Sequence, residues 1–302
     1  MSASTTVASK VVEVNGVSLS YRESGEGEPL VLVHGHVSDQ RAWIDLEPKL
    51  ATQFHVFNYS RRYAWPNEPI KDGQDAPWEQ DAFDLAALIE TLNIGPVHVL
   101  ANSSGAVITL YIARRKPHLF RNLMVEEPPL AGLYLPTFPP PLTHLLSFLI
   151  WHPLTFWPVM SFSANTVGPT IAHCKKGEYD QATSVFCSGV MGPKFWPRIQ
   201  ANPDRLRQVE DNAKWLCHFF RYNSMPKYVA EDAQNTKVPM LVLAGKESGA
   251  HQRYNAHELH RVSGATKKRF ALIEGAGHLM HEDNPQGVFD EVVRFVFGDA
   301  TA

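Results

Sequence analysis

His98-Val99-Leu100-Ala101-Asn102-Ser103-Ser104-Gly105-Ala106 is the stretch that decides the fold. The apolar residues before it are typical of a strand buried on both faces, and residues 105–115 have the pattern of a helix. A strand that turns at once into a helix holds Ser103 at the tip of a sharp bend. The small residues Ala101 and Gly105, two before and two after the serine, let strand and helix approach closely. A serine that only caps a helix would give the same local pattern. The rest of the chain has to show whether Ser103 is catalytic.

Strands and helices alternate on both sides of this bend. A hairpin with an Asn15-Gly16 turn is predicted at residues 11–21. Apolar runs then predict strands at residues 29–33, 54–59, 97–100, 123–125, 238–243 and 269–273. Helical spacing of apolar residues predicts helices at 39–50, 78–92, 105–115, 251–262 and 286–297. This alternation predicts an α/β fold, with a mostly parallel sheet and helices on both faces.

The alternation stops between residues 128 and 236, which are rich in proline and aromatic residues. Helices are predicted there at 179–190 and 203–220. We therefore expect a core made of residues 1–127 and 237–302, and a mainly helical cap at 128–236. The apolar segment 142–162 is interrupted by His144, His152, Pro153 and Pro158, so we assign it to the cap and not to a membrane span.

Composition limits the kinds of binding partner and the cellular compartment that we expect for the protein. The 302 residues carry 28 Lys and Arg against 31 Asp and Glu, a net charge of −3 without a basic run, which argues against a nucleic-acid partner. Residues 1–6 lack a basic segment followed by an apolar one, so no signal peptide is expected. Cys174, Cys187 and Cys217 form no CxxC pair and leave one over, which predicts no disulfide framework and a reduced, cytoplasmic setting. The sequence leaves a monomer and a homodimer open.

Two further loops carry residues suited to acyl transfer. The strand at 29–33 runs into His34-Gly35-His36, and the amides of His36 and Ser104 are predicted to form an oxyanion hole, with Gly35 allowing the backbone turn beside the substrate. Glu274-Gly275-Ala276-Gly277-His278 follows the last predicted strand. We predict that His278 is the general base for Ser103, and that His281 packs or faces solvent.

These three separated motifs, in this order and spacing, resemble the α/β-hydrolase superfamily over residues 11–127 and 238–297. The resemblance implies a triad acid, usually an Asp in the loop after the penultimate strand. That loop reads Gly245-Lys246-Glu247-Ser248, with Ser248 at the expected Asp position. The segment Tyr59-Ser60-Arg61-Arg62-Tyr63 also departs from the family's usual turn.

The strand at 123–125 offers another acid, because it ends in Glu126-Glu127. Strand alternation points these two side chains in opposite directions, and a charged group ending a buried strand needs a partner. We place Glu127 first, Glu126 second and Glu247 third. An acid at Glu127, with the elbow at 102–106, resembles zearalenone-type lactone hydrolases. Haloalkane dehalogenases also place a glutamate there, but they and the epoxide hydrolases use an aspartate nucleophile.

The resemblance implies a serine hydrolase that cleaves a carboxylic ester or lactone without a metal or organic cofactor. The apolar cap favours a bulky small-molecule substrate. Most of its aromatic residues are expected to be structural, and the candidates for substrate contact are Trp151, Trp157, Phe195 and Trp196. The same residues could serve C–C bond hydrolysis, perhydrolase or lyase chemistry, and the fold without turnover could serve as a small-molecule receptor.

Overall fold

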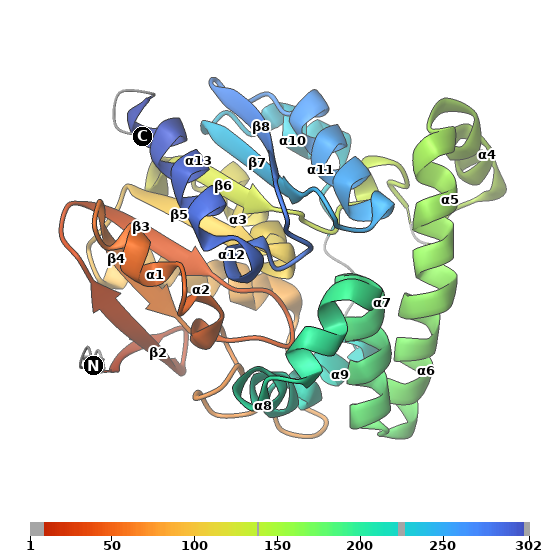
Figure 1. Ribbon diagram of the computed structural model, residues 1–302, viewed down its shortest axis with the longest axis horizontal. Coiled ribbons are helices and arrows are strands. Elements are labelled where there is room, and N and C mark those ends of the chain that lie inside the picture. The colour runs from red at the N-terminus through yellow and green to blue at the C-terminus, as the bar shows by residue number, and fades with distance from the viewer. Residues whose placement is uncertain (1–8, 138, 223–226, 299–302) are drawn as a thin grey trace.

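An eight-stranded sheet forms the centre of the protein (Figure 1), in a computed structural model that describes residues 9–137, 139–222 and 227–298. Residues 1–6, on which the expectation of no signal peptide rests, lie outside the described residues. The strands are β1 (Lys10–Val14), β2 (Val17–Ser24), β3 (Glu28–Val33), β4 (Phe54–Tyr59), β5 (Val97–Asn102), β6 (Phe120–Glu126), β7 (Met240–Gly245) and β8 (Lys268–Ile273).

The strand order is β1-β2-β4-β3-β5-β6-β7-β8. The pairs β1–β2 and β2–β4 are antiparallel, and every other neighbouring pair is parallel. The prediction of a mostly parallel α/β sheet is confirmed. The carboxyl ends of the parallel strands share one edge, which is where ligands bind in open sheets of this kind.

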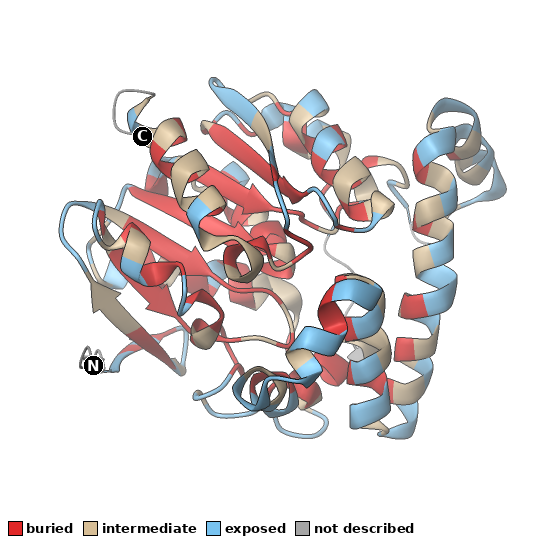
Figure 2. Cartoon of the chain, viewed as in Figure 1, coloured by how far each residue is buried: buried red, intermediate tan, exposed pale blue. Residues whose placement is uncertain are grey.

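Helices cover both faces of the sheet because its central strands are apolar on both sides. Every residue of β5 and β7 is buried, as the central red strands of Figure 2 show. On one face the strands pack against α2 (Trp78–Thr91), α3 (Ser103–Arg115) and α11 (Ala250–Val262). On the other they pack against α1 (Glu47–Leu50), α12 (Met280–Asp283) and α13 (Pro285–Phe297). Two hydrophobic cores therefore fix the sheet and the loops at its edge.

The helix expected at 39–50 is two short pieces, a 3₁₀ turn at Gln40–Trp43 and α1. Asp39 caps the first piece, with its side chain accepting the amide of Arg41. Pro48 stands in the first turn of α1, where its missing N–H costs nothing, but it could not sit inside one continuous helix.

The region between β6 and β7 is helical. It contains α4 (Leu142–Trp151), α5 (Pro153–Phe162), a π-helical segment (Ser163–Val167), α6 (Gly168–Lys176), α7 (Tyr179–Gln200), α8 (Pro203–Asp211), α9 (Ala213–Tyr222) and α10 (Ala230–Asn235). The helix predicted at 179–190 continues to residue 200 through a kink at Gly192 (φ 77°), and the one predicted at 203–220 is divided into α8 and α9. Within the described part of the chain, no helix combines the length and the apolar character needed to cross a bilayer.

The expectation of no disulfide is wrong, because Cys174 and Cys217 form one. These residues lie 43 positions apart in the sequence and meet because α6 packs against α9. Cys187 is buried and free. The expected cytoplasmic setting rested on the same interpretation of the cysteines and loses that support.

Candidate active site

Ser103 occupies a strained bend at the carboxyl edge of the sheet. β5 ends at Asn102 and α3 begins at Ser103, whose φ of 52° lies in the left-handed region that a serine seldom adopts. Gly105 permits the bend, because a Cβ there would lie 2.4 Å from the carbonyl oxygen of His34 and 2.6 Å from that of Val33. The serine is therefore held by the crossing of α3 over β3, which is the strand–turn–helix context of a nucleophile elbow.

His278 and Ser103 line the same pocket, and Glu127 lies behind the histidine. Nδ1 of His278 is 2.8 Å from Oε2 of Glu127, and both side chains are buried. The other carboxylate oxygen of Glu127 accepts the amide of Gly245 at 2.9 Å. Both oxygens of the acid thus have a donor, so its orientation is fixed.

Glu126 points the other way and pairs with a different histidine. Its Oε2 lies 2.6 Å from Nδ1 of His281, and both side chains are buried. Burial alone would lower the pKa of His281, but the Glu126 carboxylate outweighs it and raises that pKa. The ring of His281 also packs on Trp43, with centroids 4.3 Å apart.

Asn102 joins the two Glu–His pairs. Its Nδ2 donates to Oε2 of Glu126 at 3.1 Å and to the carbonyl oxygen of His278 at 3.2 Å. Asn102, the residue before Ser103, therefore binds the backbone of the loop that carries His278. Its hydrogen bond to Glu126 supports that contact.

The third candidate acid lies elsewhere. The carboxylate of Glu247 forms an ion pair with Lys194 at the surface. Ser248, at the position where the family usually has its Asp, is buried, and among the described residues its hydroxyl has no hydrogen-bond partner.

The loop after β3 approaches Ser103 at Gly35. A Cβ on Gly35 would lie 2.8 Å from Oδ1 of Asn102 and 3.1 Å from Cβ of Ser103, so only a glycine fits this crossing. The amide of Ser104 belongs to the first turn of α3, where no carbonyl of the helix can accept it. A helix of 13 residues directs partial positive charge to the same point.

The ring of His36 is part of an aromatic cluster that the sequence did not reveal. Its centroid lies 4.6 Å from that of Trp215 and 4.4 Å from that of Phe219, both on α9. Burial, with the nearby charge of Arg61, holds the pKa of His36 well below its usual range, so the ring is neutral.

Arg61 supports the bend at Ser103, and the sequence did not predict this role. Its guanidinium donates to Oγ of Ser104 and to the carbonyl oxygen of His34, each at 3.0 Å, and it forms a buried ion pair with Asp81. Burial raises the pKa of Asp81, although Arg61 opposes the shift. Arg61 lies in the segment that departs from the family's usual turn, and that departure was the available signal.

Apolar and polar side chains both line the pocket at Ser103 and His278. The apolar side chains come from the insertion and from the loops beside it: Val37, Phe186, Val190, Met191, Ile199, Val209 and Leu279. Besides the residues of the proposed catalytic loops, Ser38, Arg205, Gln208 and Glu282 supply polar side chains. A second pocket meets Ser104 and His36 and is lined by Tyr63, Trp78, Trp215 and Phe219 among others.

The four cap aromatic residues expected at the substrate do not line either pocket. Trp151 and Trp157 are 76% and 65% exposed on α4 and α5. Phe195 is buried against Gly277, where a Cβ would lie 2.7 Å from its ring, so it packs beside the histidine loop. Trp196 is buried in the cluster that holds α7, α8 and α9 together.

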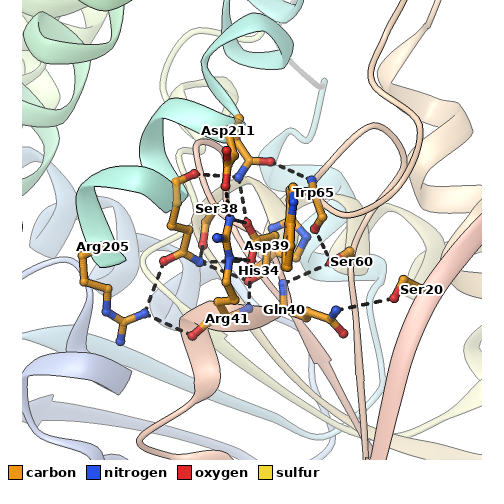
Figure 3. A network of polar contacts seen from close by, with 12 residues as sticks. Ser20, His34, Ser38, Asp39, Gln40, Arg41, Ser60, Trp65, Arg205 and Asp211 are labelled. Atoms are coloured by element: carbon orange, nitrogen blue, oxygen red, sulfur yellow. Dashed lines mark hydrogen bonds and ion pairs between the residues drawn. The ribbon is translucent and has the colours of Figure 1, made fainter. Parts of the chain in front are cut away.

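A polar network ties α8 to the loop that follows His36 (Figure 3). The buried carboxylate of Asp39 accepts from Arg41 at 2.7 Å and from Nδ2 of Asn212 at 2.8 Å. Gln208 donates to Ser38 at 3.2 Å, and Arg41 also pairs with Asp211. The insertion is therefore anchored where the predicted oxyanion loop turns into the 3₁₀ segment.

No group of three or more His, Cys, Asp or Glu side chains is placed to hold a metal ion within the described part of the chain.

Comparison with known proteins gives the family. Residues 30–291 match the model of the alpha/beta hydrolase family. The chain belongs to this family. It is 23% identical over 295 residues to a soluble epoxide hydrolase from Corynebacterium sp. (strain C12), covering 97% of this chain and 98% of the relative.

Two solved structures show the same fold. The enol-lactonase from Burkholderia xenovorans LB400 superposes with a TM-score of 0.72 at 17% identity, over 95% of this chain and 99% of that one. A carboxylesterase from Bacillus subtilis superposes with a TM-score of 0.71 at 15% identity, over 98% and 93% of the two chains. The named activities of these α/β-hydrolases differ, so the similarity establishes the fold and leaves the reaction to the site.

Proposed function

We propose that this α/β-hydrolase cleaves a carboxylic ester or lactone through an acyl-enzyme on Ser103, with His278 as general base and Glu127 as the triad acid. The observation that carries the proposal is the buried hydrogen bond between His278 and Glu127, in a pocket that Ser103 also lines. Serine, histidine and carboxylate in this relation form the constellation used for acyl transfer. The enol-lactonase and carboxylesterase folds among the relatives are consistent with it.

The residues divide the reaction between them. His278 takes the proton of Ser103 as the serine oxygen attacks the substrate carbonyl, and Glu127 stabilises the imidazolium that forms. The amides of His36 and Ser104 hold the oxyanion. His278 then gives its proton to the leaving oxygen, and water, activated by the same histidine, releases the acid from Ser103.

The substrate class follows from the pocket walls. Val190, Met191, Ile199 and Val209 supply apolar surface from the insertion. The two charged side chains of the pocket, Arg205 and Glu282, pair with each other at 3.3 Å. Such a pocket selects a bulky, uncharged group by burial. We therefore propose residues 128–236 as a cap that shapes the substrate site, over a core made of residues 1–127 and 237–302.

A fluorophosphonate probe tests the nucleophile. We expect labelling of the wild type at Ser103 and none of Ser103→Ala, while Ser184→Ala, which removes an exposed serine hydroxyl, labels as the wild type does. Labelling at another serine would refute the assignment. A panel of aryl esters of increasing acyl length, run beside macrocyclic lactones, then identifies the substrate class. Intact binding without turnover across that panel would favour a receptor.

A further inference from the structure

The helices α4 and α5 expose a row of large apolar side chains. Six residues on them, which we name the α4–α5 face, are between 48% and 76% exposed: Leu142, Leu146, Ile150, Trp151, Leu154 and Trp157. Leu142, Leu146 and Ile150 are spaced by four and share one side of α4, and Leu154 and Trp157 are spaced by three on α5. Both helices lie at the outer edge of the molecule (Figure 1).

The inner sides of the same helices are packed in the ordinary way. Phe148 is buried, stacks on Tyr134 with centroids 4.7 Å apart and meets Phe156 at 5.3 Å. Thr155 and Val159 are buried on α5. The orientation of the two helices is therefore set by packing, and the α4–α5 face is the side that is left to solvent (Figure 2).

The exposed area is that of a protein interface. Aromatic side chains offer about 150–250 Å² each. The two tryptophans, 76% and 65% exposed, therefore present roughly 350 Å² at the upper end of that range. The four aliphatic side chains add to this area, so the α4–α5 face approaches the roughly 800 Å² that each partner buries in a standard interface. It also exceeds the largest apolar patch on a typical monomer, roughly 300–600 Å².

Charge indicates which partner fits. No Asp, Glu, Lys or Arg occurs between Glu127 and Lys175, so the whole of residues 128–174 is uncharged. In a two-fold interface each surface meets its own copy, and any charge near the axis would meet a like charge. An uncharged apolar face avoids this cost. Helices that lie on anionic lipid carry Lys and Arg on their polar side, and α4 and α5 have none.

We propose that the α4–α5 face is the interface of a homodimer, in which the two helices of one copy pack against the same two helices of a second copy. Thr143, Ser147 and Ser161, which are exposed on the same helices, supply an uncharged polar rim. The dimer leaves the pockets at Ser103 and Ser104 uncovered, because the α4–α5 face contributes no residue to either. The proposal does not depend on the proposed reaction.

Sedimentation velocity over a wide range of protein concentration tests it. We expect the wild type to sediment as a dimer that dissociates on dilution. The variant Ile150→Lys/Leu154→Lys brings like charges together across the interface and should raise the dissociation constant at least about 100-fold, since such pairs cost several kcal/mol. Val11→Lys is the matched control, because Val11 is 63% exposed on β1.

Circular dichroism and the rate of Ser103 labelling should be unchanged in the double variant, which separates a lost interface from a lost fold. A wild type that is monomeric at every concentration would overturn the proposal, as would a dimer that survives in the double variant. A second arm mixes the protein with phosphatidylcholine vesicles. If the wild type floats with the vesicles as a monomer and the double variant does not, the partner is a lipid surface and the proposal is wrong.

Discussion

Replacing Glu127 by Gln tests the proposed acid, and the structure predicts how the replacement would inactivate the enzyme. In the wild type one carboxylate oxygen accepts the amide of Gly245 and the other faces Nδ1 of His278. The amide of a glutamine must keep its oxygen on Gly245, because a backbone N–H can only donate. Its NH₂ group then faces Nδ1 and forces that nitrogen to be the acceptor. The proton moves to Nε2, so the ring presents a proton to Ser103 where a lone pair is needed.

The expected loss is large because the wrong tautomer removes the base and the carboxylate charge together. We expect kcat to fall by about 10⁴-fold, or roughly 5.5 kcal/mol in the barrier. The assay is steady-state hydrolysis of the best ester in the panel. Histidine ¹⁵N chemical shifts add a direct readout, since the proton of His278 should move from Nδ1 to Nε2.

Two matched variants define the result that would refute this reasoning. Glu247→Gln removes only a surface ion pair and should stay within about tenfold of wild type, or about 1.4 kcal/mol. Glu126→Gln tests the neighbouring pair with His281 and should keep the tautomer of His278. An active Glu127→Gln beside a dead Glu126 or Glu247 variant would move the acid. Installing Asp at Ser248 in the Glu127→Gln background should restore part of the activity.

Three further changes test the support around the site. Gly105→Ala should cost at least about 3 kcal/mol of unfolding free energy in urea, because its Cβ meets backbone oxygen that cannot move aside. Asn212→Leu keeps the branched shape but leaves Asp39 and the amide of Trp65 each without one hydrogen-bond partner, and should cost about 2–4 kcal/mol in the same assay. Burial, with a smaller contribution from the neighbouring His278, lowers the pKa of His251 to about 4. The unfolded chain therefore binds a proton at His251 that the folded protein does not, and stability falls as pH drops from about 6.5 towards 4. His251→Phe should remove about 2 kcal/mol of the stability lost between pH 7 and pH 5, measured by urea unfolding at both values.

The sheet was predictable because its central strands are continuous apolar runs. The runs at β3, β5 and β7 are apolar on both faces, which is typical of a parallel sheet covered on both sides. The placement of Glu126 and Glu127 on opposite sides followed from strand alternation alone. What the alternation could not show is that Glu126 also has a histidine, since the spacing of His278 and His281 is meaningful only once the loop after β8 is folded.

The orientation of the insertion was not predictable from sequence. α4 and α5 carry no charge on either side, so no polar face marks which side meets solvent, and Trp151 and Trp157 could not be assigned to the exterior. The reverse holds for Trp215 and Phe219, which are spaced by four on α9. Their spacing marks a buried stripe, but only the packing of α9 against the loop after β3 shows that the stripe meets His36. The disulfide between Cys174 and Cys217 was not predictable either, because it depends on the packing of α6 against α9.

The position of Glu127 has a mechanical consequence. It is the last residue before the helical insertion, and Pro128 and Pro129 follow it directly. A proline ring fixes its own φ, so the two successive prolines leave the stem that carries the insertion with few bonds about which to rotate. A rotation of the helices relative to the sheet would therefore have to occur at bonds further along the chain, beyond the two rings. The carboxylate of Glu127 would then keep its contacts with His278 and Gly245 while the helices moved.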